Sequence, residues 1–149
     1  MSDLAKHFPK LTNENHQETS PATVSYNCIA WAAQDSERWW WPDRYGLYYW
    51  PPAVQRAENL DAFVRAYAEL GYEVCQEETP EENVDKIAIF VDASGTPTHV
   101  ARQLPNGRWT SKCGKLEDIE HDLEALTGNC YGEVAIRMKR KRGVTQVAA

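Results

Sequence analysis

The second half of the chain consists of short apolar runs separated by turn signals, and this pattern constrains the fold most strongly. Residues 86–91 form an almost wholly apolar run, as in a buried strand. After a turn at 92–97, residues 98–104 predict a second strand, and the Asn106-Gly107 pair is the strongest short-range hairpin signal. Residues 109–112 are expected to return antiparallel, and residues 131–138 to add a last strand. The pattern therefore predicts a mainly antiparallel sheet.

Helical patterns stand before the sheet and again late in the chain. Residues 58–71 place five apolar side chains on one face, with Asn59 able to cap the start and Gly71 the end. The nearly continuous apolar run at 29–33 indicates a buried helix, capped by Ser25, or by Asn27 if the helix starts later. A third helix is expected over 115–126. This order of elements predicts an α+β fold.

The length of 149 residues predicts one domain, 1–149, with enough chain to bury a core. Residues 1–25 are polar and predict an irregular N-terminal arm, and residues 140–149 predict a flexible tail. The chain has no window of eighteen apolar residues and no apolar core of a signal peptide. We therefore expect a cytoplasmic protein without membrane contact, unless a dedicated secretion system exports it. The net charge of -6 argues against nucleic acid as a partner.

Aromatic residues are concentrated between positions 39 and 50. Trp39, Trp40 and Trp41 are consecutive, and four more tryptophan and tyrosine residues follow by position 50. Each such ring buries a large area and keeps a polar group, so the cluster forms either an aromatic sub-core or a stacking wall for a ligand. Prolines in and after this segment prevent regular structure and predict a folded loop.

Cys28 stands in the first turn of the expected helix at 29–33. A thiol there faces unpaired backbone N–H groups and the positive end of the helix dipole, and both favour the nucleophilic thiolate. Core packing is the simpler alternative, because free cysteine is among the most buried residue types. None of the four cysteines forms a C-x-x-C pair. We therefore expect no metal site and no cofactor, and free thiols rather than disulfides.

His99 is expected at the beginning of a strand, directly after a Gly-Thr-Pro turn, where its side chain can face a helix end. A histidine near a cysteine can take its proton and form a thiolate–imidazolium pair, which a third polar group usually orients. Ser111 lies on the return strand and is the candidate for that group. The alternative is a structural histidine with a hydrogen-bonded ring. Asp118 and His121 are three residues apart on the expected late helix, where a solvated face is simpler than a metal or substrate contact.

The order of elements and two short motifs resemble the papain-like cysteine hydrolases, most closely their NlpC-like branch. The matching positions are Asn27-Cys28-Ile29-Ala30, His99-Val100-Ala101-Arg102, Pro105-Asn106-Gly107 and Ser111. The resemblance implies a papain-like fold with the N-terminal helix packed on the sheet. It also implies Cys28 as nucleophile, with its N–H in an oxyanion hole, and His99 as base.

The sequence departs from that family's pattern at three places. Asn27 stands where the family has aspartate, Ile29-Ala30 replaces Ser-Gly, and Ser111 replaces a histidine, asparagine or glutamine. Separately, three longer runs resemble an uncharacterised bacterial family that spans nearly all of the chain. These runs are YNCIAWA, WWWP and PTHVARQLPNGRWTSK.

Two functions follow as hypotheses. The first is a thiol hydrolase of amide, isopeptide or ester bonds (a peptidase, amidase or deamidase) with a peptide or protein substrate. Its catalytic residues are Cys28, His99 and Ser111, and its substrate-binding residues are Asn27, Trp39, Trp40 and Trp41. The second is a non-catalytic module that binds a peptide, sugar or protein through the tryptophan-rich loop. The sequence does not determine the oligomeric state.

Overall fold

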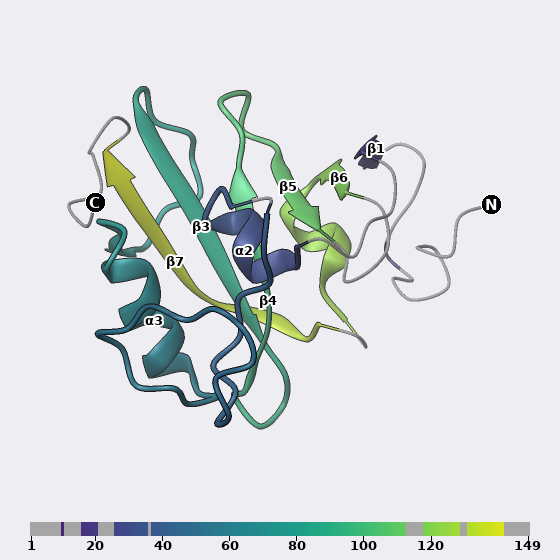
Figure 1. The fold of residues 1–149 in the computed structure, drawn as a ribbon. Coiled ribbons are helices and arrows are strands. Elements are labelled where there is room, and N and C mark those ends of the chain that lie inside the picture. The colour runs from purple at the N-terminus through teal and green to yellow at the C-terminus, as the bar shows by residue number, and fades with distance from the viewer. Residues whose placement is uncertain are drawn as a thin grey trace.

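The computed structural model describes residues 10, 16–20, 26–35, 37–112, 118–128 and 131–141. In this part of the chain seven strands form one sheet in the order β1-β6-β5-β4-β3-β7-β2, and all neighbouring strands are antiparallel (Figure 1). The strands are β1 (His16–Ser20), β2 (Glu73–Cys75), β3 (Val84–Val91), β4 (Pro97–Gln103), β5 (Trp109–Lys112), β6 (Asp118–His121) and β7 (Glu133–Lys141). The fold is therefore α+β with an antiparallel sheet, which confirms the predicted class.

The apolar run of the second half forms the centre of the sheet. Strand β3 pairs with β4 on one side and with β7 on the other, and its six central residues are buried. The Asn-Gly signal lies in the β4–β5 turn, where the Leu104 N–H donates to the Arg108 carbonyl at 2.7 Å. In the described chain the β4–β5 ladder consists of Arg102–Thr110 and Gln103–Trp109. Among the described residues, the start of β4 therefore has no ladder partner on the β5 side.

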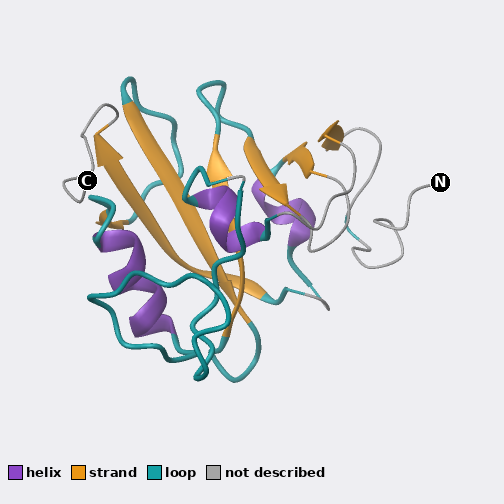
Figure 2. Cartoon of the chain, viewed as in Figure 1, coloured by secondary structure: helices purple, strands orange, loops and turns teal. Residues whose placement is uncertain are grey.

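Two helices, α2 (Cys28–Ala32) and α3 (Leu60–Ala68), cover one face of the sheet (Figure 2). Helix α2 contacts both β4 and β5. Helix α3 begins at its predicted cap, where the Asn59 side chain accepts from the Ala62 N–H at 2.8 Å. The buried Tyr67 hydroxyl of α3 donates to the Ile29 carbonyl of α2 at 2.7 Å, which fixes the two helices to each other.

The sheet separates two apolar clusters. The first contains Cys28, the buried faces of α2 and α3, and Val100 of β4. The second contains Phe90, Ala101 and the apolar side of a short 3-10 helix, η1 (Leu123–Leu126). Because successive side chains of a strand point to opposite faces, Val100 lies on the α2 side and His99 on the other.

The helix expected over 115–126 is wrong. Residues Asp118–His121 form strand β6 instead, paired with β5 and β1, and among the described residues of that range only Leu123–Leu126 are helical. The three- and four-residue spacing of the apolar positions imitated a helix. Ile119 and Leu123 nevertheless reach the same core, one from the strand and the other from η1. The pairing partners lie far away in the chain, and a local pattern does not contain them.

Two terminal predictions also need correction. Part of the expected irregular arm forms the edge strand β1, which is polar and held by ladder bonds to β6. Strand β7 runs to Lys141, so the first two residues of the expected tail belong to the sheet. The remaining residues of both segments lie outside the described chain. No helix among the described residues combines the length and apolar character needed to cross a membrane.

Candidate active site

Cys28 is the first residue of α2, and the preceding Asn27 caps the helix. The Asn27 side-chain oxygen accepts from the Ala30 N–H at 3.1 Å, while its own backbone is extended. The alternative cap, Ser25, lies outside the described residues. The Cys28 side chain is buried, with 8% of the residue exposed.

Burial dominates the electrostatics of the Cys28 thiol. It raises the pKa of Cys28 from 9.0 to about 11, against the lowering effect of the backbone N–H groups of Val100 and Ile29 and of the Lys112 charge. A helix of five residues also has a short run of aligned peptide dipoles. The expected thiolate is therefore wrong for the resting protein, in which the thiol is protonated at neutral pH.

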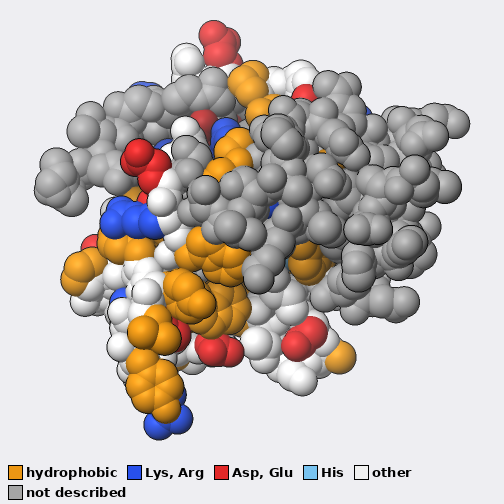
Figure 3. Space-filling model, turned by 45° about the vertical axis from the view of Figure 1, so that its right-hand side comes forward, with side chains coloured by type: hydrophobic (Ala, Val, Ile, Leu, Met, Phe, Trp, Pro, Cys, Tyr) orange, Lys and Arg blue, Asp and Glu red, His pale blue; other side chains and the backbone are white. Residues whose placement is uncertain are grey.

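A cleft of about 340 Å³ opens beside the thiol. It is lined by Asn27, Cys28, Trp39, Trp41, Tyr48, Thr98 and Tyr131, none of which carries a charge at neutral pH. Figure 3 shows hydrophobic side chains gathered on the lower part of the face in view. The walls of the cleft therefore favour an apolar or aromatic group over a charged one.

The tryptophan-rich loop divides between the core and the cleft. Trp40 and Trp50 are buried in the cluster beneath α2 and α3, with 4% and 2% exposed. Trp39 and Trp41 line the cleft, where Trp39 contacts the Tyr48 ring at 6.0 Å between centroids. The sub-core hypothesis thus holds for Trp40 and Trp50, whereas Trp39 and Trp41 line the cleft and Trp40 does not.

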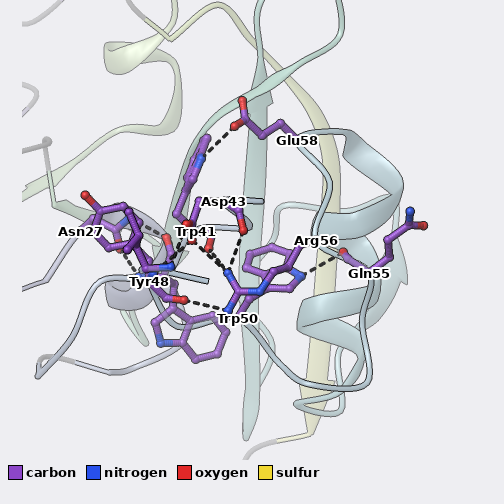
Figure 4. A network of polar contacts seen from close by, with 10 residues as sticks. Asn27, Trp41, Asp43, Tyr48, Trp50, Gln55, Arg56 and Glu58 are labelled. Carbon is purple, nitrogen blue, oxygen red and sulfur yellow. Dashed lines mark hydrogen bonds and ion pairs between the residues drawn. The ribbon is translucent and has the colours of Figure 1, made fainter. Parts of the chain in front are cut away.

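Polar contacts fix the aromatic loop beside the thiol (Figure 4). The Asn27 amide donates to the Trp40 carbonyl at 2.7 Å, and the Trp40 N–H donates back to the Asn27 oxygen at 3.1 Å. The Arg56 guanidinium donates to the Asp43 carboxylate at 3.0 Å and to the Tyr48 carbonyl at 2.9 Å. Asn27 therefore joins the start of α2 to the loop, and Arg56 joins Asp43 to Tyr48 within the loop.

His99 is fully buried on the second face of the sheet. Its ring stacks on Tyr131, with centroids 4.0 Å apart and planes 8° apart, and meets the edge of Phe90. Nε2 lies 2.9 Å from Ser111 Oγ, whereas Nδ1 is buried without a hydrogen-bond partner in the described chain. Burial, and secondarily the neighbouring His121, hold the pKa of His99 well below 6.5, so the ring is neutral.

The contact of Ser111 continues to a second histidine that the sequence did not assign to the site. Ser111 Oγ lies 2.7 Å from Nε2 of His121, and Nδ1 of His121 lies 2.7 Å from the Asp122 carbonyl. The expected helix placed His121 beside Asp118. In the structure Ser111 is opposite Ile119 in the β5–β6 ladder, so His121, two residues on, shares its face. Recognising 118–121 as a strand would have revealed this relation.

The thiol and the imidazole lie on opposite faces of β4, and no hydrogen bond joins them in the part of the chain that the structure describes. The Cys28 thiol lies against the backbone N–H of Val100, which directly follows His99 in β4. Tyr131 lines the cleft together with Cys28 and also stacks on His99, so it separates the ring from the cleft. The structure thus brings Asn27, Cys28, Trp39 and Trp41 together in one cleft, with His99 and Ser111 behind Tyr131.

The remaining candidates contribute little to this site. In the described residues no three His, Cys, Asp or Glu side chains gather at a potential metal site. Cys75 is a free thiol in β2, and Cys113 and Cys130 lie outside the described part of the chain.

A family model described as a domain of unknown function (DUF7689) matches residues 17–139. The chain belongs to this family. No curated protein and no solved structure matches the sequence. The matched region of the DUF7689 domain contains all the residues of the cleft and of the hydrogen-bonded chain from His99 to His121.

Proposed function

We propose that this DUF7689 domain is a papain-like thiol hydrolase that cleaves an amide, isopeptide or ester bond through Cys28 and His99. The observation that carries the proposal is the pairing of two unused groups. One is the Cys28 thiol on the wall of an open cleft. The other is the neutral imidazole of His99, buried on the opposite face of the sheet, whose Nδ1 has no hydrogen-bond partner among the described residues. A base nitrogen that is buried and unpartnered is costly to maintain, which favours a chemical use over simple packing.

The chemistry runs as two acyl transfers. Cys28 Sγ bonds to the substrate carbonyl carbon while its proton passes to His99 Nδ1. The amine or alcohol then leaves with that proton, and the acyl group stays on sulfur as a thioester. Water attacks the thioester, His99 takes the water proton, and the acid departs as the thiol is restored. Backbone N–H groups around Cys28 stabilise the oxyanion in both steps.

A protonated thiol is compatible with this scheme if the thiol loses its proton only as it attacks the substrate. Because the pKa of Cys28 is raised, His99 acts as general base during attack and not as the partner of a preformed ion pair. The scheme requires Tyr131 to leave its stacked position and the His99 ring to turn toward the cleft when substrate binds, so that Nδ1 can reach Sγ. Hydrogen bonds of this kind are often long in a free enzyme and tighten only with substrate bound.

The papain-like architecture is supported by the order in which the parts occur. A helix whose first residue is cysteine packs on an antiparallel sheet, the histidine follows the start of a strand, and Ser111 lies on the return strand. The neutral aromatic cleft favours a substrate with an apolar or aromatic acyl group, such as an apolar side chain of a peptide or protein.

The test is acylation by a chromogenic ester of this type. Wild-type protein is mixed with p-nitrophenyl 3-phenylpropionate, nitrophenol release is followed, and the acyl group is located by mass spectrometry after digestion. We expect a burst approaching one equivalent, with the acyl group on Cys28. The Cys75→Ser variant should retain the burst, whereas the Cys28→Ser and His99→Phe variants should lose it.

The matched ester of succinic acid measures the preference for an apolar acyl group. We expect it to acylate Cys28 at least about tenfold more slowly, because its carboxylate must be desolvated in an uncharged cleft. Acylation of Cys75 as fast as Cys28, or no acylation of Cys28 by either ester, would overturn the hydrolase.

A specific observation favours a second candidate, a non-catalytic binding module. Cys28 and His99 have no mutual hydrogen bond in the described chain, and the raised pKa of Cys28 reduces its thiolate. The aromatic cleft would then hold an apolar peptide side chain or the face of a sugar ring. Quenching of tryptophan fluorescence by 3-phenylpropionamide without any acylation of Cys28 would select this candidate.

A further inference from the structure

Three adjacent strands each contribute one buried polar side chain to a continuous hydrogen-bonded chain. His99 comes from β4, Ser111 from β5 and His121 from β6, and all three residues are 0% exposed. The contacts are 2.9 Å and 2.7 Å long, and a third of 2.7 Å ends on the Asp122 carbonyl. Hydrogen bonds inside an apolar cluster lower the stability of the fold unless every donor meets an acceptor.

The donor and acceptor of each hydrogen bond can be assigned by starting at the Asp122 carbonyl, which can only accept. The Asp122 carbonyl only accepts, so His121 carries its proton on Nδ1. When His121 carries only that proton, its Nε2 is an acceptor and the Ser111 hydroxyl donates to it. The serine oxygen then accepts from Nε2–H of His99. His99 is left with an unprotonated Nδ1, the nitrogen that has no partner in the described chain.

We propose that His121, acting through Ser111, is a positioning residue that holds His99 in the tautomer with an unprotonated Nδ1. The inference deepens the proposed function, on which its catalytic meaning rests. It also addresses the weakness of Ser111 as a lone orienting group. A free serine hydroxyl can donate or accept, and so it selects neither tautomer of a histidine. With its proton committed to His121, the same hydroxyl is an acceptor only.

The reverse arrangement shows what His121 contributes. If His121 carried a proton on both nitrogens, it would donate to Ser111, and Ser111 would donate to Nε2 of His99. His99 would then be protonated on Nδ1 and unable to accept the thiol proton. The protonation state of His121 therefore decides whether His99 can act as a base.

The first test reads the tautomer directly by two-dimensional ¹H–¹⁵N NMR of the histidine side chains at pH 7.5. In wild-type protein we expect His99 to carry its proton on Nε2 and His121 on Nδ1. In Ser111→Ala and His121→Phe we expect His99 to change to a mixture of tautomers. Thr110→Val is the matched control, because it removes a buried hydroxyl from the neighbouring position of β5, where it accepts from Trp31 and faces away from the chain.

If a variant fails to fold, the wild-type spectrum is sufficient, since a wild-type His99 protonated on Nδ1 would overturn the positioning role of His121. An unchanged Nε2–H tautomer in folded Ser111→Ala or His121→Phe would overturn it equally. A general base contributes about 10²–10⁴-fold to rate. We therefore expect Ser111→Ala and His121→Phe to slow acylation of Cys28 at least about tenfold, and Thr110→Val less than about twofold.

The spectra and the acylation assay separate two failures. If the NMR spectra show the expected tautomers but wild-type Cys28 is not acylated, the positioning role of His121 is supported and the hydrolase is not. If Ser111→Ala and His121→Phe are both acylated at the wild-type rate, the hydrolase is still supported and the positioning role of His121 is overturned.

Discussion

At the scale of single residues, burial sets the chemistry of Cys28 and His99. Both are neutral at pH 7, because transfer from water disfavours the charged form of each: the pKa of the thiol rises and that of the imidazole falls. Backbone N–H groups and the Lys112 charge act in the opposite direction on Cys28 but do not compensate. A pair of neutral groups is the state from which a proton can pass from sulfur to nitrogen during attack.

The raised pKa of Cys28 predicts the pH dependence of its alkylation. Only the thiolate reacts, so the rate with iodoacetamide should rise about tenfold per pH unit from pH 7 and level off only near 11. Cys75, in the strand β2, is the internal comparison. Peptide mass spectrometry gives both rates. A plateau of Cys28 alkylation below pH 8 would indicate a preformed thiolate and contradict this prediction.

At the scale of elements, α2 depends on contacts outside itself. A helix of five residues is too short to be stable alone, so its position comes from its cap and from packing. Asn27 caps it and also bonds both backbone groups of Trp40, and Tyr67 of α3 bonds the Ile29 carbonyl. In the part of the chain that the structure describes, the Asn59 side chain bonds only the Ala62 N–H, as the cap of α3.

The two asparagine caps provide a matched pair of substitutions. Asn59→Ala should lower the free energy of unfolding by about 1 kcal/mol, the usual cost of a lost cap. Asn27→Ala should cost about 2–3 kcal/mol, because it also breaks the buried bonds with Trp40. Urea unfolding followed by circular dichroism measures both. Equal losses would show that the contacts between Asn27 and the aromatic loop contribute nothing to stability.

At the scale of the whole molecule, the sheet carries an apolar core on each face. The α2 side contains the thiol and the aromatic loop, whereas the other side encloses the chain from His99 to His121 among apolar residues. Burying a neutral histidine links folding to pH, because the unfolded chain protonates it more readily than the folded one.

The lowered pKa of His99 therefore predicts loss of stability in mild acid. Below about pH 6.5 the unfolded state binds a proton that the folded state does not, so the free energy of unfolding falls as pH falls. The slope from this residue approaches about 1.4 kcal/mol per pH unit until the folded pKa is reached. Urea unfolding at pH 7.5, 6.5 and 5.5 measures it.

His99→Gln is the comparison for this slope, because glutamine does not titrate. Its free energy of unfolding should depend less on pH between 6.5 and 5.5 than that of the wild type. The lowered pKa values of Asp35 and Asp43 act only below their ordinary value of 3.8 and do not interfere. Parallel curves for the two proteins would contradict a buried neutral His99.

The sequence by itself determined the central sheet, the helices beginning near Cys28 and Leu60, and the β4–β5 hairpin. Each rests on local information: an apolar run, an asparagine cap, or the Asn-Gly pair. It also pointed to Cys28, His99 and Ser111, and to two possible fates for the tryptophan loop. These features lie within short stretches of chain, where spacing and residue type are sufficient.

Tertiary structure decided the rest, because the deciding contacts join distant residues. Strand β6 forms because it pairs with β5 and β1. The register of that pairing places His121 within hydrogen-bond distance of Ser111, and the helical spacing of the sequence did not indicate it. Packing sent Trp40 into the core and left Trp39 and Trp41 at the cleft. Burial, which no local pattern measures, reversed the expected ionisation of Cys28 and left Nδ1 of His99 unpartnered in the described chain.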